Sequence, residues 1–116
     1  MARFPRSVYG EGSEPDPRFS LANERTFLAW IRTSLALIAA GVAIEVLEVG
    51  HPGWRLAAAL VFAALGILAA IRAWLGWAGT ERALRNGREL PGSGIGIVLT
   101  GGVVVAVLLV GIGVLL

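Results

Sequence analysis

Two arginines spaced seven residues apart are the first chemical feature of this sequence. The stretch "NERTFLAWIRTS", residues 23–34, carries Arg25 just before a long apolar run and Arg32 inside that run. Residues seven apart lie on one face of an α-helix. Because a guanidinium stays charged even when it leaves water, this face would attract an anion or need a counter-ion. Glu24, beside Arg25, is a candidate for that counter-ion.

A third arginine lies in the second apolar run. Arg72 is five residues before Trp77, and Arg32 is five residues after Phe27. At 1.5 Å per residue, each arginine is therefore roughly 7.5 Å inside its run. If the two runs form antiparallel neighbouring helices, the two guanidinium groups reach one level. We therefore expect Arg25, Arg32 and Arg72 to line an inward-facing, positively charged funnel.

Two glutamates lie near the opposite end of the first run. Glu45 and Glu48 are three residues apart, a spacing that places them on one helical face. We expect them at the outer mouth of the same path, although residues at the end of a helix also commonly reach lipid headgroups. Glu81, which follows the second run, is a further counter-ion candidate for the arginines.

A simpler interpretation of the arginines is anchoring. At this depth a long side chain can keep its stem in lipid and place its guanidinium at the phosphates. Trp30, Trp74 and Trp77 are predicted at the same height, as in an interfacial aromatic belt. The sequence does not decide between a lined path and snorkelling side chains.

The composition determines which elements carry these side chains. Hydrophobic residues make up 56% of the 116 residues and charged residues 16%, too little polar surface for a small soluble domain. Three continuous apolar runs, at about residues 27–47, 56–77 and 95–116, are each long enough to cross a bilayer as a helix. The predicted fold is an all-α integral membrane protein with three transmembrane helices in an up-down-up bundle.

The region before the first run divides into two parts. Residues 1–15 combine proline, glycine and charge without periodicity, which predicts a disordered cytoplasmic tail, and residues 16–116 form the membrane domain. Asp16 is a predicted N-cap with Pro17 at the first helical position. The helix that follows is expected either to lie along the membrane surface or to run straight into the first span.

Arginines flanking the spans predict the orientation. They are concentrated before the first run and between the second and third, at Arg3, Arg6, Arg18, Arg25, Arg82, Arg85 and Arg88. The connection between the first two runs holds only Arg55. Because positive residues favour the cytoplasmic side, the N-terminus is expected in the cytoplasm and the C-terminus outside.

Several classes of chemistry have no support in the sequence. There is no cysteine and only one histidine, His51, so neither a metal site nor a cofactor is expected. No nucleophile has a base beside it, and no phosphate-binding glycine loop follows a strand, which argues against an enzyme. The arginines are interpreted as topology and headgroup signals and not as a nucleic-acid surface.

The segment "DPRFSLANERTFLAWIRTSLALIAAGVAI" closely resembles the opening of the YidH family, also known as domain of unknown function 202. The resemblance implies a multi-pass protein of the bacterial plasma (inner) membrane. A related domain forms the membrane part of the vacuolar transporter chaperone complex, where basic residues of an oligomeric channel guide polyphosphate. The resemblance to this related domain implies path-lining roles for Arg25 and Arg32, with Glu24 as their partner. This chain lacks the catalytic polymerase domain of that complex.

Three functions are consistent with the sequence. The first is a subunit of a homo-oligomeric anion or polyanion pathway, with small residues in the second and third runs available for helix contacts. The second is a non-conducting membrane scaffold or partner subunit of a larger complex. The third, a small proton-coupled drug exporter, is disfavoured because Glu45 is its only buried-carboxylate candidate and a fourth span is missing.

Overall fold

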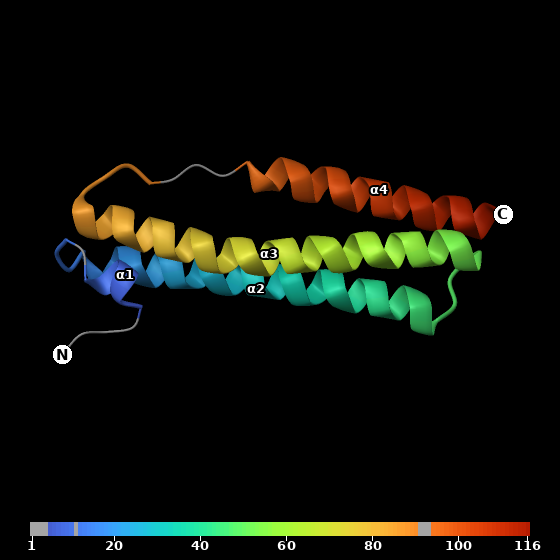
Figure 1. Ribbon diagram of the computed structural model, residues 1–116, viewed down its shortest axis with the longest axis horizontal. Helices are drawn as coiled ribbons and strands as arrows, with labels where there is room; N and C mark the ends of the chain where they lie inside the picture. The colour runs from blue at the N-terminus through green and yellow to red at the C-terminus, as the bar shows by residue number, and fades with distance from the viewer. Residues whose placement is uncertain (1–4, 11, 91–93) are drawn as a thin grey trace.

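The computed structural model describes residues 5–10, 12–90 and 94–116, and the regular secondary structure of these residues is entirely helical. They are α1 (Arg6–Tyr9), α2 (Pro17–Val46), α3 (Pro52–Asn86) and α4 (Ile95–Leu115). The chain runs along the long axis in α2, returns in α3 and runs along it again in α4 (Figure 1). All three long helices are long and apolar enough to cross a membrane. The prediction of an all-α membrane protein with three spanning helices is confirmed.

Local chemistry determines where α2 begins. Asp16 is the N-cap, and its carboxylate accepts a hydrogen bond of 2.9 Å from the backbone N–H of Arg18, while Pro17 occupies the first turn. The Arg18 guanidinium also bonds this carboxylate, and together these donors lower the pKa of Asp16 below its ordinary value. Both features agree with the prediction. Of the two expected courses, α2 takes the straight one and continues unbroken into the apolar run.

Helix α3 is longer than the predicted span. It begins at Pro52, where the His51 ring accepts a hydrogen bond from the backbone N–H of Gly53. It continues past Trp77 through Asn86 and ends at Gly87, whose φ of 66° is left-handed. Much of the predicted connection between the second and third spans is therefore helical, because "ERALRN" consists largely of good helix formers.

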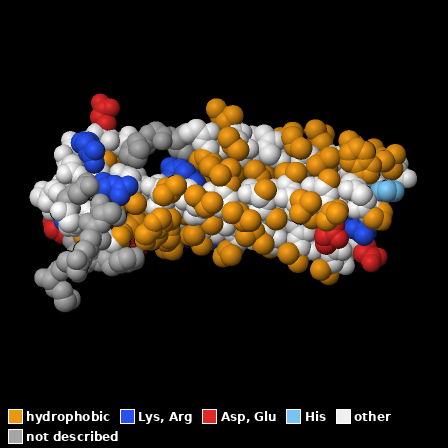
Figure 2. Space-filling model, in the orientation of Figure 1, with side chains coloured by type: hydrophobic (Ala, Val, Ile, Leu, Met, Phe, Trp, Pro, Cys, Tyr) orange, Lys and Arg blue, Asp and Glu red, His pale blue; other side chains and the backbone are white. Residues whose placement is uncertain are grey.

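The centre of the bundle is α3. It packs against both α2 and α4, whereas no Cα atom of α2 comes within 8 Å of one in α4, both helices being fully described. The buried core lies along these two contacts and comprises Leu37, Phe62, Leu65, Ala69 and Ala106. Most other apolar side chains face outwards and form a belt along the molecule, with charged groups gathered mainly towards its two ends (Figure 2). Such a surface is matched to lipid or to another membrane protein.

Glycine permits the close crossing of α2 and α3. A Cβ atom at Gly66 would lie 2.9 Å from the carbonyl oxygen of Ser34, and one at Gly41 would lie 2.9 Å from that of Ala59. The Ser34 hydroxyl donates a hydrogen bond of 2.7 Å to the Gly66 carbonyl. This bond satisfies a buried hydroxyl and joins the two helices inside the apolar region.

The predicted disordered tail is corrected for residues 5–10 and 12–15, whereas residues 1–4 and 11 lie outside the described residues. Helix α1 packs against α3, Val8 is fully buried, and the Tyr9 ring lies 6.1 Å from the Trp77 ring between centroids. The backbone N–H of Ser13 donates to the Arg85 carbonyl. Composition alone does not predict this order, because the segment is held by residues at the C-terminal end of α3, including Trp77 and Arg85.

Replacing Gly66 by alanine should loosen the crossing of α2 and α3. The added carbon would lie 2.5 Å from Ile38 Cγ1 as well as against Ser34, so the helices must move apart. We expect a loss of about 1–3 kcal/mol in the free energy of unfolding, measured by denaturant titration in mixed micelles. The matched control is Gly101→Ala, because nothing lies within 4 Å of a Cβ at that position. Equal effects of the two substitutions would contradict the close-crossing account.

Candidate functional site

Polar side chains are concentrated at the end of the bundle where α2 begins and α3 ends, here called the N-terminal end. The most buried is Glu81 of α3, whose exposed fraction is 3%. Its carboxylate accepts hydrogen bonds of 2.7 Å from the Ser20 hydroxyl and 3.1 Å from the Asn23 amide. The same amide donates to the Trp77 carbonyl at 3.0 Å. This polar lock joins α2 to α3 and satisfies a carboxylate that burial would otherwise penalise.

A hollow of about 390 Å³ adjoins the polar lock and is here called the acidic pocket. Three of its lining residues are glutamates, and two are aromatic; the lining consists of Tyr9, Glu14, Pro15, Pro17, Ser20, Leu21, Glu24, Trp77 and Glu81. Among the described residues, no group of three carboxylate, histidine or cysteine side chains is placed to hold a metal ion. The pocket therefore gathers three carboxylates beside the polar lock.

Arg85 fastens the N-terminal segment beside the acidic pocket. Its guanidinium donates to the Glu14 carboxylate at 2.9 Å and to the Tyr9 carbonyl at 3.1 Å. It also lies 5.4 Å from the centre of the Tyr9 ring, within the range of a cation–π contact. With an exposed fraction of 8%, this arginine is a structural cation of the fold.

Glu24 was predicted as the counter-ion of Arg25 and Arg32. The structure places its side chain on the wall of the acidic pocket. At 100° per residue, it lies about 100° around the helix from Arg25. Within the described part of the chain, no ion pair joins Glu24 to Arg25 or Arg32.

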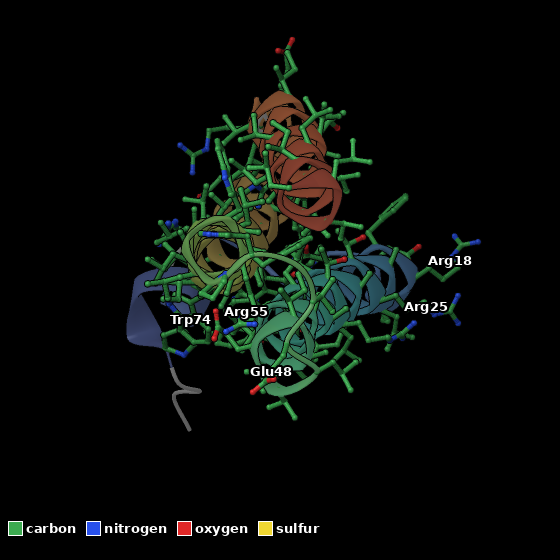
Figure 3. The ribbon with its side chains drawn as sticks, turned by 90° about the vertical axis from the view of Figure 1, so that its right-hand side faces the viewer. Arg18, Arg25, Glu48, Arg55 and Trp74 are labelled. Carbon is green, nitrogen blue, oxygen red and sulfur yellow. The ribbon has the colours of Figure 1, made fainter. Side chains whose placement is uncertain are left out.

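A second hollow, of about 480 Å³, lies between α2 and α4 and is here called the α2–α4 groove. Its lining residues are Arg25, Thr26, Ala29, Trp30, Thr33, Gly96, Leu99 and Thr100. Arg25 is the one charged residue among them, and its side chain extends from α2 away from α3 (Figure 3). The groove is thus apolar with a cation at its border.

The three arginines of the predicted funnel do not share one face. Arg25 and Arg32 are both exposed on the same side of α2. The Arg72 guanidinium lies 5.4 Å from the centre of the Trp30 ring, which is partly buried against the core. Because Trp30 and Arg32 are about 200° apart around α2, Arg72 is at the α2–α3 contact and not on the outward face. Its contact with Trp30 still places it near the level of Arg32.

The glutamates at the far end are also separated. Glu45 pairs with Arg55 of α3 at 3.6 Å, so its carboxylate is engaged within the chain. Helix α2 ends at Val46, and Glu48 follows in a turn with a left-handed φ of 52°. The predicted common helical face is therefore corrected. Arg55 lies between the ends of α2 and α3, whereas Glu48 points outwards (Figure 3).

Sequence reasoning missed the polar lock and the Arg85 contacts. The signal was present as helical spacing: Ser20 and Asn23 are three apart, and Trp77, Glu81 and Arg85 are each four apart. Each set lies on one face of its helix. Spacing within one helix does not give the rotation of α2 relative to α3, and this rotation determines whether the two faces meet.

Replacing Asn23 by alanine should weaken the polar lock. The substitution removes donors to both the Glu81 carboxylate and the Trp77 carbonyl and leaves a buried carboxylate short of a partner. We expect a loss of about 1–3 kcal/mol in unfolding free energy, measured in mixed micelles. Thr26→Ala is the control, since among the described residues that hydroxyl bonds to the Ala22 carbonyl of its own helix and not to α3, and the substitution should change stability by less than about 0.5 kcal/mol. A loss no larger than that of the control would refute the lock.

The domain of unknown function DUF202 matches residues 18–83, the region that contains the polar lock and the three arginines of α2, Arg18, Arg25 and Arg32. The chain is 50% identical over 80 residues to an uncharacterized protein of Mycobacterium tuberculosis, a match covering 67% of this chain and 66% of that protein. It therefore spans just under two thirds of the length of that relative. No solved structure matches the chain.

A second set of relatives gives the location. The chain is 45% identical over 82 residues to the inner membrane protein YidH of Escherichia coli K12, a match covering 69% of this chain and 71% of YidH, and the same holds for YidH of Shigella flexneri. Together with the three spanning helices, this similarity makes it a multi-pass protein of the bacterial plasma membrane. The chain belongs to the YidH family and carries its characteristic domain, DUF202.

Proposed function

We propose that this chain is a subunit of a homo-oligomeric pathway for anions or polyanions, with the outward face of α2 lining a path between copies. The observation that carries the proposal is the position of Arg32. It is exposed inside the apolar part of α2, on a face that no other helix of the chain covers. Arg25 is about two turns nearer the N-terminal end on that face.

The cost of a lipid-facing arginine supports an aqueous or anion-lined face. A charged side chain at the centre of a spanning helix costs about 2.5–3.5 kcal/mol, and this is the upper limit for Arg32, because an arginine roughly 7.5 Å inside the run can also extend towards the headgroups. A water-filled path along α2 removes this cost for Arg32. Positive groups along such a path would also select for anions.

The packing of the bundle supports a path between copies. Helix α3 occupies the centre, with the core side chains of Phe62 and Leu65 buried against its neighbours. A single copy therefore leaves no room for an aqueous path along its axis. The apolar faces of α2 and α4 remain available for contact with further copies.

The remaining roles follow from the proposed orientation, with the N-terminal end in the cytoplasm. Arg72, over Trp30, is an interfacial anchor beside the path and not its lining. Glu24 contributes negative charge to the acidic pocket at the cytoplasmic mouth. In this proposal the chain conducts and does not catalyse, and chloride, inorganic phosphate and polyphosphate are the substrates to test.

Ionic conductance of the purified protein in planar bilayers tests this function. Under a salt gradient, wild type should give a reversal potential close to the anion equilibrium potential. Arg32→Gln should reduce anion over cation selectivity about tenfold, because it removes a fixed positive charge from the path. Arg32→Lys should retain most of the selectivity.

The matched control is Arg18→Gln, which removes an arginine outside the apolar span that is already paired with Asp16. Its reversal potential should equal that of wild type. Silent bilayers from a correctly inserted oligomer would overturn the pathway. The arginines would then be snorkelling anchors, as expected of a membrane scaffold or a partner subunit.

A further inference from the structure

We propose that the α2–α4 groove binds one anionic phospholipid, with the lipid phosphate on Arg25 and an acyl chain along the apolar wall. This inference goes beyond the proposed pathway and does not depend on conduction. It rests on the shape of the groove, its charge and its position along the spanning helices. Each of these three observations points to a lipid with a negative headgroup.

The shape is that of an open lateral slot. Helices α2 and α4 both pack on α3 but not on each other, and the space between them, about 480 Å³, is lined by α2 on one side and by α4 on the other. Ala29, Trp30 and Leu99 provide apolar wall, and Gly96 leaves one side without a side chain. An acyl chain would cover these groups as the surrounding lipid covers the rest of the belt.

The charge of the groove is positive and uncompensated by its own lining. Arg25 is the one ionisable residue among the lining residues, and no ion pair to it occurs in the described part of the chain. The hydroxyls of Thr26 and Thr100 donate to carbonyls of their own helices at 3.1 and 2.8 Å. The guanidinium is therefore the charged donor that a phosphate would meet.

Along the membrane normal, the charged residue and the apolar wall of the groove lie in the same order as the headgroup and the acyl chain of a lipid. Arg25 comes two residues before Phe27, where the apolar run begins, and is thus at the level of the headgroups. Thr33, at the other end of the α2 wall, is eight residues further, or about 12 Å deeper. Basic pockets between spanning helices on the cytoplasmic side are suited to anionic headgroups.

A lipid fits the groove better than a second copy of the chain. The outward faces of α4 and of the apolar part of α3 offer no carboxylate within the described residues, so either would bury Arg25 without a partner. A phospholipid supplies both the phosphate and the apolar chain in one molecule. The groove is therefore assigned to lipid, and contact between copies to other faces.

Native mass spectrometry of the full chain, titrated with phosphatidylglycerol or phosphatidylcholine of identical acyl chains, tests the assignment. The first bound phosphatidylglycerol should have about fivefold higher affinity than the first phosphatidylcholine, the effect of one arginine near the membrane surface. Arg25→Gln should abolish this preference, and Arg25→Lys should largely restore it. Arg32→Gln, on the same face but outside the groove lining, should leave it unchanged.

A second pair of variants locates the lipid without removing charge. Gly96→Leu places a side chain in the groove, and Gly101→Leu places the same side chain elsewhere on α4; nothing lies within 4 Å of a Cβ at either position. Gly96→Leu should weaken the first phosphatidylglycerol at least fivefold, whereas Gly101→Leu should match wild type. Both variants should fold, because neither meets a neighbour.

Three results would overturn the proposal. One is a phosphatidylglycerol preference that survives Arg25→Gln, which would mean that other cations bind the headgroup. Another is an equal effect of Gly96→Leu and Gly101→Leu, which would exclude the groove as the site. The third is loss of the oligomer with unchanged lipid binding in Gly96→Leu, which would assign the groove to a second copy.

Discussion

The contact between α2 and α3 is the interaction on which the rest of the structure depends. It is made close by Gly41 and Gly66 inside the apolar region, and it is held at the N-terminal end by hydrogen bonds to Glu81. Together these constraints fix both the distance between the helices and the rotation of α2 about its axis. That rotation, and not the sequence spacing alone, turns Arg25 and Arg32 away from the bundle.

Opposite charges are consequently separated around a single helix. The side of α2 that carries Glu24 faces the acidic pocket, and the side that carries Arg25 borders the α2–α4 groove. Two of the cations on α3 are used differently: Arg85 fastens the N-terminal segment, and Arg72 lies on Trp30. One end of a small bundle thus presents an acidic and a basic hollow to the same membrane surface, and each can be tested without altering the other.

The sequence predicts features set within a single helix, and it does not predict contacts that depend on how two helices are oriented relative to each other. Run length identifies the three spans, Asp16 with Pro17 identifies the start of α2, and the seven-residue spacing identifies the common face of Arg25 and Arg32. The face of Arg72 and the partners of Glu81 need the relative rotation of α2 and α3, which no spacing within one helix contains. Glu48 was assigned to a helix that ends before it, because a left-handed φ at a glutamate has no sequence signal.

The lipid proposal and the pathway proposal both assign an anion-binding role to Arg25. A phosphate bound to Arg25 would neutralise the cation nearest the membrane surface and leave Arg32 as the uncompensated charge on that face of α2. An anion entering along α2 would then meet a single deep arginine instead of two in series. Anion occupancy of such a path would depend on the anionic lipid content of the membrane, because lipid and permeant anion compete for the same guanidinium. Both proposals therefore require Arg25 to be accessible from the membrane surface, which is how the fold presents it.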